Sequence, residues 1–372
     1  MIITDVEVNR YKQMKESDMA HAAGHEIIIV KVKTDAGVTG ISFIGTPIFS
    51  HGEVGDIAVT LISRNLRNIV VGENPLHTQK LWMNMFDAPW RMGMRGMILD
   101  CIAAIDFALW DIKGKLMGVP VSDLFGNHRH SVPTYANVGQ QLPPEEMGEQ
   151  AAKYVEHGHT AVKIRAGLTA VSLSEATERV AKVREAIGPD IKLLVDINGT
   201  WDVNTSIDML KKWEEFDLYW LEEPVPAEDI EGYARIRKSA GNTYIVGGEQ
   251  NAKLNDFRQF IEKDAIDIIQ PNAACTGGIT SWLDIYNYAT SYNVPISPWN
   301  LQQIHIPLAI GLPNVKWIEY FTPDRKTFQN TLLIGPKFVE EKKEDAIHIS
   351  GSTAPGLGIE LNEEFAEETL VR

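Results

Sequence analysis

The chain contains the stretches Ile191-Lys-Leu-Leu-Val-Asp196, Leu218-Tyr-Trp-Leu-Glu-Glu223 and Tyr244-Ile-Val-Gly-Gly-Glu249. Each is a short apolar run, rich in β-branched or aromatic side chains, that ends in a carboxylate, and such runs are typical of buried strands. The carboxylates Asp196, Glu222 and Glu249 are 26 and 27 residues apart (222 − 196 and 249 − 222), which matches one strand-plus-helix unit. The three stretches therefore predict consecutive strands of a parallel sheet.

The same alternation of strand-like and helical segments continues over most of the chain. Helical stretches such as residues 172–187 and 205–215 separate the apolar runs. Strand–helix units repeated over about 200 residues favour a closed parallel barrel over an open sheet. The eight strand-like runs lie at residues 132–138, 160–165, 191–196, 218–223, 244–249, 265–270, 294–297 and 316–320.

The segments on either side of these units have a different pattern. Residues 26–40 predict a hairpin, and residues 94–117 predict a long helix that ends at Gly118. The tail beyond residue 335 contains no strand–helix unit, so we expect it to pack on the N-terminal part. We therefore divide the chain into an N-terminal domain, residues 1–128 completed by 336–372, and a barrel domain, residues 129–335.

The composition is that of a folded protein, and it narrows the range of partners. The 372 residues are 44% hydrophobic and 23% charged, which excludes a disordered chain. With 35 basic and 50 acidic residues the net charge is −15, which argues against nucleic acid and anionic membranes as partners. An acidic small molecule is not excluded, because a bound divalent cation can reverse the local field.

The two cysteines and the N-terminal residues indicate the cellular compartment of the protein. Cys101 and Cys275 lie far apart and in no metal-binding spacing, which indicates free thiols in a reducing compartment. No apolar stretch is long enough to span a bilayer, and the first residues alternate like a strand rather than a signal peptide. We therefore expect a cytoplasmic protein.

The three carboxylates point to a metal site. In a parallel barrel the ends of the strands meet at the C-terminal rim, where barrel enzymes place their active sites. Three carboxylates crowded there repel one another strongly unless a cation lies between them. Ligation by oxygen alone suits a hard ion, and Mg²⁺ is the one we expect.

Further motifs occur in a fixed order along the chain. They are Ala104-Ile-Asp-Phe-Ala-Leu-Trp-Asp-Ile-Lys-Gly-Lys115, Lys163-Ile-Arg165, Val195-Asp-Ile-Asn198, Trp220-Leu-Glu-Glu-Pro224, Gly248-Glu249, Gln270-Pro-Asn272 with Gly277-Gly278, and Trp317-Ile-Glu319. Through them, nearly the whole chain resembles the enolase superfamily, and within it the branch of mandelate racemase and muconate lactonizing enzyme. The resemblance implies an α/β fold: a modified (β/α)7β barrel of the TIM type, with an α+β capping domain formed by the N-terminal part and the C-terminal tail.

The resemblance also implies a chemistry. Asp196, Glu222 and Glu249 are the implied ligands of Mg²⁺, to which a carboxylate substrate binds. A base then removes the α-proton of the substrate, and the metal stabilises the enolate as a Lewis acid. Glu319 matches the glutamate on the family's eighth strand, which as a protonated acid donates a hydrogen bond to the enolate.

The motif on the second barrel strand departs from the family, which usually has two lysines there and uses the second as the base. Lys163 and Arg165 are two residues apart and share one face of the strand. A guanidinium stays protonated and is a poor base, whereas Arg165 and the metal would lower the pKa of Lys163. Lys163 is therefore the favoured base, with Arg165 or a base elsewhere in the chain as alternatives.

A second departure concerns the opposite face of the substrate. The family commonly has an acid–base pair of Asp and His on strands six and seven, whereas this chain has Asn272 and Trp299, which exchange no protons. Racemisation needs proton carriers on both faces, but β-elimination of water needs only one base. His305, six residues beyond Trp299, is expected on the following helix in a structural role.

These patterns together predict a Mg²⁺-dependent dehydratase of a sugar acid. A racemase, epimerase or cycloisomerase of a carboxylate is the alternative, and a metal-binding barrel without catalysis is a further one. Polar side chains at the rim favour a polyhydroxylated acid. The candidate substrate contacts are Asn198, Asn272, Trp299 and His25, the last in a polar segment that resembles the family's specificity loop. We also expect a homo-oligomer.

Overall fold

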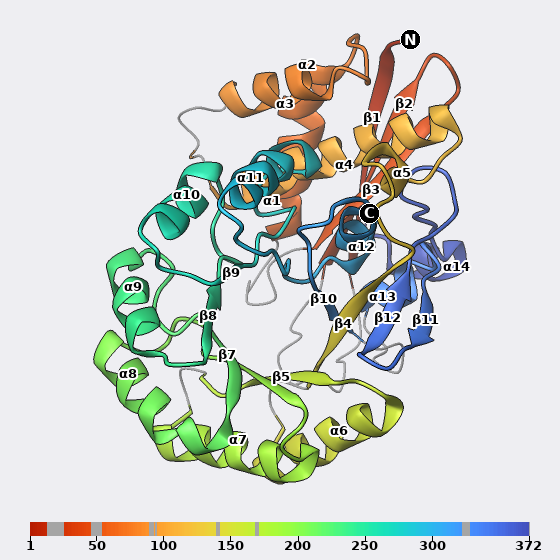
Figure 1. The fold of residues 1–372 in the computed structure, drawn as a ribbon. Coiled ribbons are helices and arrows are strands. Elements are labelled where there is room, and N and C mark those ends of the chain that lie inside the picture. Colours follow the sequence, from red (N-terminus) through yellow and green to blue (C-terminus); the bar gives the residue numbers. More distant parts are fainter. Residues whose placement is uncertain are drawn as a thin grey trace.

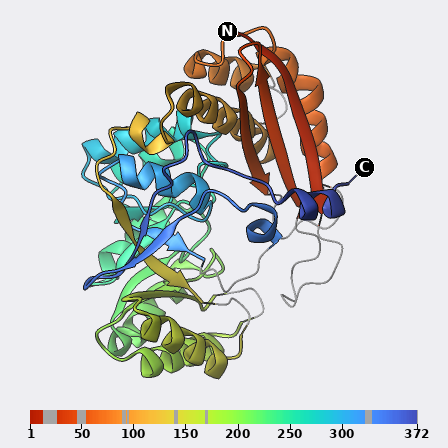
Figure 2. The ribbon, with the colours of Figure 1, turned by 90° about the vertical axis from the view of Figure 1, so that its right-hand side faces the viewer.

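The computed structural model describes residues 1–12, 26–45, 54–88, 93, 95–138, 142–167, 171–321 and 328–371. The chain begins with a three-stranded antiparallel sheet in the order β1 (Ile3–Lys12), β2 (Glu26–Thr34) and β3 (Thr39–Gly45) (Figure 2). The predicted hairpin is the β2–β3 pair. The Thr34 hydroxyl supports its turn by donating to the carbonyl of Val38, 2.8 Å away.

Helix α4 (Met97–Met117) is the long helix predicted from the sequence, and it packs on β2 and β3. It ends at Gly118, whose φ of 69° is the left-handed conformation common at helix ends. Among the helices that the structure describes, none combines the length and apolar character needed to cross a membrane. The other helices of this part are α1 (Val54–Thr60), the π-helix η1 (Leu61–Leu66), α2 (Arg67–Val70), α3 (Thr78–Asp87) and α5 (Val121–Leu124).

The predicted parallel barrel is present, and it closes through the pairing of β10 with β4. Its strands are β4 (Ser131–Asn137), β5 (Ala161–Arg165), β6 (Lys192–Asp196), β7 (Leu218–Glu222), β8 (Tyr244–Gly247), β9 (Ile268–Ile269) and β10 (Ile318–Tyr320). The run predicted at 294–297 contributes a single bridging residue, Ile296, between β9 and Val315. Pro295 and Pro298 flank this residue, and a proline has no N–H to donate to a sheet.

Helices surround the barrel on its outer side (Figure 1). Each connects one strand to the next, as expected for parallel strands. They are α6 (Pro144–His157), α7 (Leu173–Ile187), α8 (Val203–Lys212) with the 3₁₀-helix η2 (Glu214–Phe216), α9 (Ile230–Ser239), α10 (Leu254–Glu262), α11 (Ile279–Ser291) and α12 (Gln302–Gly311).

The inside of the barrel is filled by apolar side chains at its lower level and by polar ones at its C-terminal rim. A buried cluster inside the strands contains Tyr135, Ala161, Leu194, Trp220 and Val246. Side chains two residues further along a strand point the same way. The strands therefore present Asn137, Lys163, Asp196 and Glu222 directly above this apolar layer.

The C-terminal tail divides between the two parts of the molecule. The hairpin of β11 (Val339–Lys342) and β12 (Ile347–Ser350) adds antiparallel to residues 131–133 of β4, instead of packing on the N-terminal part as expected. The start of β4 precedes its pairing with β5, so its backbone groups need other partners. The tail also contains α14 (Glu363–Thr369), and α13 (Phe328–Leu332) lies just before the tail.

The last part of the tail does lie on the N-terminal domain. The backbone N–H of Val371 donates to the carbonyl of Arg10 at 2.8 Å, and that of Leu357 donates to the Asp111 carboxylate at 2.7 Å. The domain boundaries at residues 128 and 336 stay predictions.

The contact between α4 and the start of α11 fixes the cap on the barrel. The Asp106 carboxylate accepts hydrogen bonds from the backbone N–H of Thr280, at 3.0 Å, and from its hydroxyl. The indole of Trp82 donates to the carbonyl of Gly277 at 2.7 Å. Gly278 has a φ of 118°, and a Cβ added there would lie 2.4 Å from an Asp106 carboxylate oxygen.

We expect Gly278→Ala to destabilise the protein by about 2–4 kcal/mol, because it adds a steric clash to a strained backbone. The matched control is Gly241→Ala: Gly241 also has a positive φ, of 60°, but its Cβ would meet nothing within 4 Å. That variant is expected to lose only about 1 kcal/mol from backbone strain. Urea unfolding measures both, and equal losses would contradict the proposed clash.

Candidate active site

The three carboxylates predicted from the sequence converge at the C-terminal rim of the barrel. Asp196 and Glu222 are the last residues of β6 and β7 and are paired in register, and Glu249 follows β8. One oxygen of each lies within 4.8 Å of the others. Asp196 and Glu222 are 0% exposed and Glu249 is 8% exposed. Such a buried acidic group is stable only with a counter-charge or with protons bound.

The electrostatics of this group fit a hard cation. Burial raises the pKa of Glu222 to about 7, and the neighbouring Asp196 adds to the effect against the attraction of Lys163. Burial and the nearby Glu223 raise the pKa of Glu249 well above its ordinary value. Within the described residues, the Oε2 atoms of Glu222 and Glu249 are buried and accept no hydrogen bond. Free anionic oxygens around one point are the ligands that Mg²⁺ prefers.

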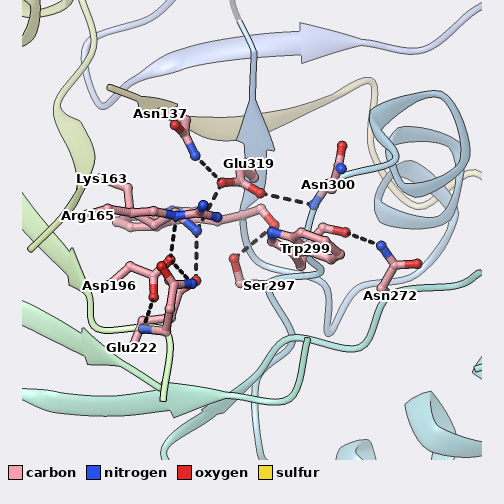
Figure 3. A network of polar contacts seen from close by, with 12 residues as sticks. Asn137, Lys163, Arg165, Asp196, Glu222, Asn272, Ser297, Trp299, Asn300 and Glu319 are labelled. Carbon is pink, nitrogen blue, oxygen red and sulfur yellow. Dashed lines mark hydrogen bonds and ion pairs between the residues drawn. The ribbon is translucent and has the colours of Figure 1, made fainter. Parts of the chain in front are cut away.

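Lys163 lies between two carboxylates. Its Nζ is 2.7 Å from Glu222 Oε1 and 2.9 Å from Glu319 Oε1, and the side chain is fully buried (Figure 3). Burial lowers the pKa of Lys163, but the attraction of these two carboxylates outweighs burial, so the pKa lies well above its ordinary value. With both carboxylates ionised and no cation between the ligands, Lys163 is therefore an ammonium group.

Arg165 lies on the same face of β5, as predicted, and pairs with the metal-ligand candidate Asp196. Its Nε is 3.2 Å from Asp196 Oδ2. Burial lowers the pKa of Arg165, but Asp196 and the other carboxylates raise it overall. The backbone carbonyl of Arg165 accepts a hydrogen bond from Arg179 of α7 at 3.1 Å, which fixes the end of the strand.

Glu319 accepts hydrogen bonds in this site instead of donating one. Its carboxylate is bound by the amide side chain of Asn137, by the backbone N–H of Asn300 at 3.0 Å and by Lys163. Burial raises the pKa of Glu319, but Lys163 and the other donors lower it overall. Glu319 is therefore ionised here, in contrast to the protonated donor expected from the family. Asn137, at the end of β4, was not among the residues predicted for the site.

The side chain of Asn272 forms hydrogen bonds with backbone groups of neighbouring loops. It is 2% exposed. Its Nδ2 donates to the carbonyl of Trp299 at 3.1 Å (Figure 3). Its Oδ1 accepts hydrogen bonds from the backbone N–H groups of Ala274 and Cys275. These bonds occupy the oxygen and one N–H of the Asn272 amide, and the substrate contact of Asn272 stays a prediction. Trp299 is half-buried beside it.

The remaining substrate candidates differ in what the structure describes. Asn198 donates from Nδ2 to Asp196 Oδ2 at 3.1 Å and from its backbone N–H to Oδ1 at 2.9 Å. Its side chain therefore orients a metal-ligand candidate, while its Oδ1 is buried without a donor among the described residues. His25 lies outside the described residues.

His305 is buried on α12, in agreement with the structural role expected for it. Its Nε2 accepts a hydrogen bond from the N–H of Ala273 at 3.1 Å, and its Nδ1 is 2.6 Å from the carbonyl oxygen of Asn300. Burial lowers the pKa of His305 to about 4, against a smaller opposing effect of the Asn300 carbonyl.

This pKa predicts a pH dependence of stability. Unfolded histidine takes up a proton below about pH 6.5, whereas folded His305 stays neutral down to about pH 4, so stability falls as the pH falls between these values. The loss is on the order of 3 kcal/mol. Urea unfolding between pH 4.5 and 7 is expected to give a shallower pH dependence for His305→Asn than for the unmodified protein. Parallel curves would show that His305 titrates normally.

Two family models match the chain. The model described as the mandelate racemase / muconate lactonizing enzyme N-terminal domain matches residues 3–126, and the model described as enolase C-terminal domain-like matches residues 146–365. The chain therefore belongs to the mandelate racemase and muconate lactonizing enzyme branch of the enolase superfamily, with its capping domain and (β/α)7β barrel.

Characterised relatives include enzymes of two reaction types. The L-talarate/galactarate dehydratase of Salmonella typhimurium is 32% identical over 303 residues, which cover 79% of this chain and 73% of that protein. The 3,6-anhydro-alpha-L-galactonate cycloisomerase of Streptomyces coelicolor is 30% identical over 309 residues, which cover 82% and 83%. The crystal structure of L-talarate dehydratase from Polaromonas sp. JS666, complexed with Mg and L-glucarate, matches with a TM-score of 0.84 at 28% identity, covering 100% of this chain and 98% of that one.

Proposed function

We propose that this protein is a Mg²⁺-dependent dehydratase of a sugar acid. The observation that carries the proposal is the buried group of Asp196, Glu222 and Glu249 next to a lysine, in a barrel whose relatives include sugar-acid dehydratases. Asp196, Glu222 and Glu249 would hold the ion. When bound, the ion supplies Lewis-acid stabilisation of the negative charge that develops on the substrate carboxylate.

Lys163 is the base in this proposal. Glu222 and Glu319 hold its proton most tightly while both are fully charged. Once the charge of Glu222 is shared with a cation, that attraction weakens and the pKa of Lys163 falls toward the range of a working base. Arg165 keeps its proton throughout, so its role is to pair with anionic oxygens of the substrate.

A single base accounts for both proton transfers of dehydration. The C2–H bond breaks as Lys163 Nζ takes the proton. The C3–O bond then breaks as Lys163 gives this proton to the leaving hydroxyl group, which departs as water. The resulting enol then becomes a 2-keto acid. Glu319, ionised and held by Asn137 and Asn300, keeps the amine of Lys163 in place through this cycle.

The opposite face of the site favours dehydration over racemisation. In the described part of the chain, the positions of the family's acid–base pair hold an amide engaged with the backbone and an indole. Neither Asn272 nor Trp299 can carry a proton to a second face. A cycloisomerase also needs only one base, and the Streptomyces coelicolor relative keeps that reaction as the second candidate.

Incubation with mono- and diacid sugars in D₂O separates these reactions. A dehydratase forms a 2-keto acid, which a colorimetric keto-acid assay and NMR both detect. Deuterium at the α-carbon without loss of water would identify an epimerase, and a new ring without loss of water a cycloisomerase. Binding of an acid with neither exchange nor product would identify a non-catalytic barrel.

We also propose that the protein acts in the cytoplasm as a homo-oligomer. Support for the location comes from Cys101 and Cys275, which are both free thiols, as expected in a reducing compartment. Light scattering of the purified protein measures the number of copies in the assembly.

A further inference from the structure

A chain of hydrogen bonds connects the loop after β9 with the candidate base. The N–H of Ala273 donates to His305 Nε2, and His305 Nδ1 contacts the carbonyl of Asn300. The N–H of Asn300 donates to Glu319 Oε2, and Glu319 Oε1 contacts Lys163 Nζ. His305 is thus connected to Lys163 through the backbone of Asn300 and the carboxylate of Glu319. It contacts neither Glu319 nor Lys163 directly.

The two partners of His305 fix its tautomer. A backbone N–H can only donate, so Nε2 carries a lone pair, and a carbonyl can only accept, so Nδ1 carries the hydrogen. Both ring nitrogens are satisfied in the neutral form, and the side chain is 0% exposed. Loss of either bond would leave a buried polar group without a partner, which is unfavourable.

The backbone that His305 holds is strained. Asn300 and Leu301 have φ values of 53° and 42°, two consecutive non-glycine residues in the left-handed region. Residues with a Cβ disfavour this conformation, so the turn persists only while the surrounding contacts hold it. Glu319 holds the N–H side of Asn300, and His305 holds its carbonyl side.

We propose that His305 is a positioning residue for this active site. The Nδ1–H of His305 holds the backbone carbonyl of Asn300 and so orients the backbone N–H of Asn300 toward Glu319. Glu319 in turn keeps Lys163 in place beside Glu222. The catalytic consequence rests on the proposed function, whereas the hydrogen-bonded connection does not. His305 acts through this chain and touches no reacting atom.

Two amide variants separate the two bonds of His305. Asn places an N–H donor near the position of Nδ1 and keeps the bond to Asn300, whereas Gln places an acceptor near Nε2 and keeps the bond to Ala273. We expect His305→Gln to lower kcat by about 10–100-fold with little change in KM, because the reacting groups are displaced rather than removed. His305→Asn is expected to retain most of the activity, and the rise of Tm with Mg²⁺ is expected to be unchanged in both. If kcat falls equally in the two variants, or falls in proportion to their loss of Tm, His305 only packs in the core and does not position the active site.

Amide hydrogen exchange of the same proteins without substrate tests the connection independently of turnover. We expect faster exchange at Asn300 in His305→Gln than in His305→Asn. If the unmodified protein dehydrates no acid while this difference holds, the proposed function fails and the connection stands. Equal exchange at Asn300 in both variants and in the unmodified protein would overturn the connection, whatever the activity.

Discussion

Glu249→Gln is expected to abolish the stabilisation of the protein by Mg²⁺ and to lower the dehydration rate by about 10³-fold or more. The substitution removes one of three anionic ligands but keeps the shape of the side chain. Without Mg²⁺ the same substitution relieves repulsion, because Glu249 is buried next to Glu222, Glu223 and Asp196. The variant is therefore expected to be at least as stable as the unmodified protein in the absence of the ion.

Thermal unfolding with and without Mg²⁺ measures both effects. Binding of the ion to the folded state raises Tm in the unmodified protein, by an amount that grows with ion concentration. The matched control is Glu228→Gln, on an exposed loop after β7, which is expected to respond to Mg²⁺ like the unmodified protein. An undiminished rise of Tm in Glu249→Gln would place the ion elsewhere.

Lys163→Met is expected to have the second large effect, a loss of α-proton exchange of about 10³-fold or more together with a loss of stability. The stability falls because Glu222 and Glu319 lose the cation between them, and an uncompensated buried charge costs about 3–5 kcal/mol. Arg165→Lys is expected to keep measurable exchange with a raised KM, because its role is to bind the substrate. Exchange into D₂O followed by NMR, with Mg²⁺ and substrate present, measures the first effect.

The double variant Lys163→Met with Glu319→Gln separates chemistry from stability. Removing the charge of Glu319 is expected to restore much of the stability lost in Lys163→Met, without restoring exchange. If exchange continues at the full rate in both Lys163→Met and Arg165→Met, neither residue is the base, and the proton acceptor lies elsewhere in the chain.

The barrel could be predicted from the sequence because parallel strands are buried on both faces and therefore form continuous apolar runs. The absence of a full strand at residues 294–297 could not be predicted, because whether Ile296 forms a strand or a single bridge depends on how its neighbours pack. The β11–β12 hairpin could not be placed either. Its strand Val339–Lys342 is polar and at least partly exposed, and its pairing with residues 131–133 is a contact across more than 200 positions in the chain.

The carboxylate group could be predicted for the same reason as the barrel, because Asp196 and Glu222 end successive strands and Glu249 lies two residues beyond the next strand. The protonation state of Glu319 could not, because it depends on donors from Asn137 and Asn300, which belong to other elements. Asn272 is a similar case: its position at a strand end pointed to the site, whereas the turn it supports at residues 273–275 was not visible in the sequence.

Crystals grown with Mn²⁺ test whether Asp196, Glu222 and Glu249 share one divalent cation, because Mn²⁺ takes the same oxygen ligands as Mg²⁺ and gives an anomalous signal. We expect one anomalous peak at the C-terminal rim of the barrel, with an oxygen of each of the three side chains bound to it. No peak at this position under saturating Mn²⁺, or three side chains that turn away from one another, would contradict it.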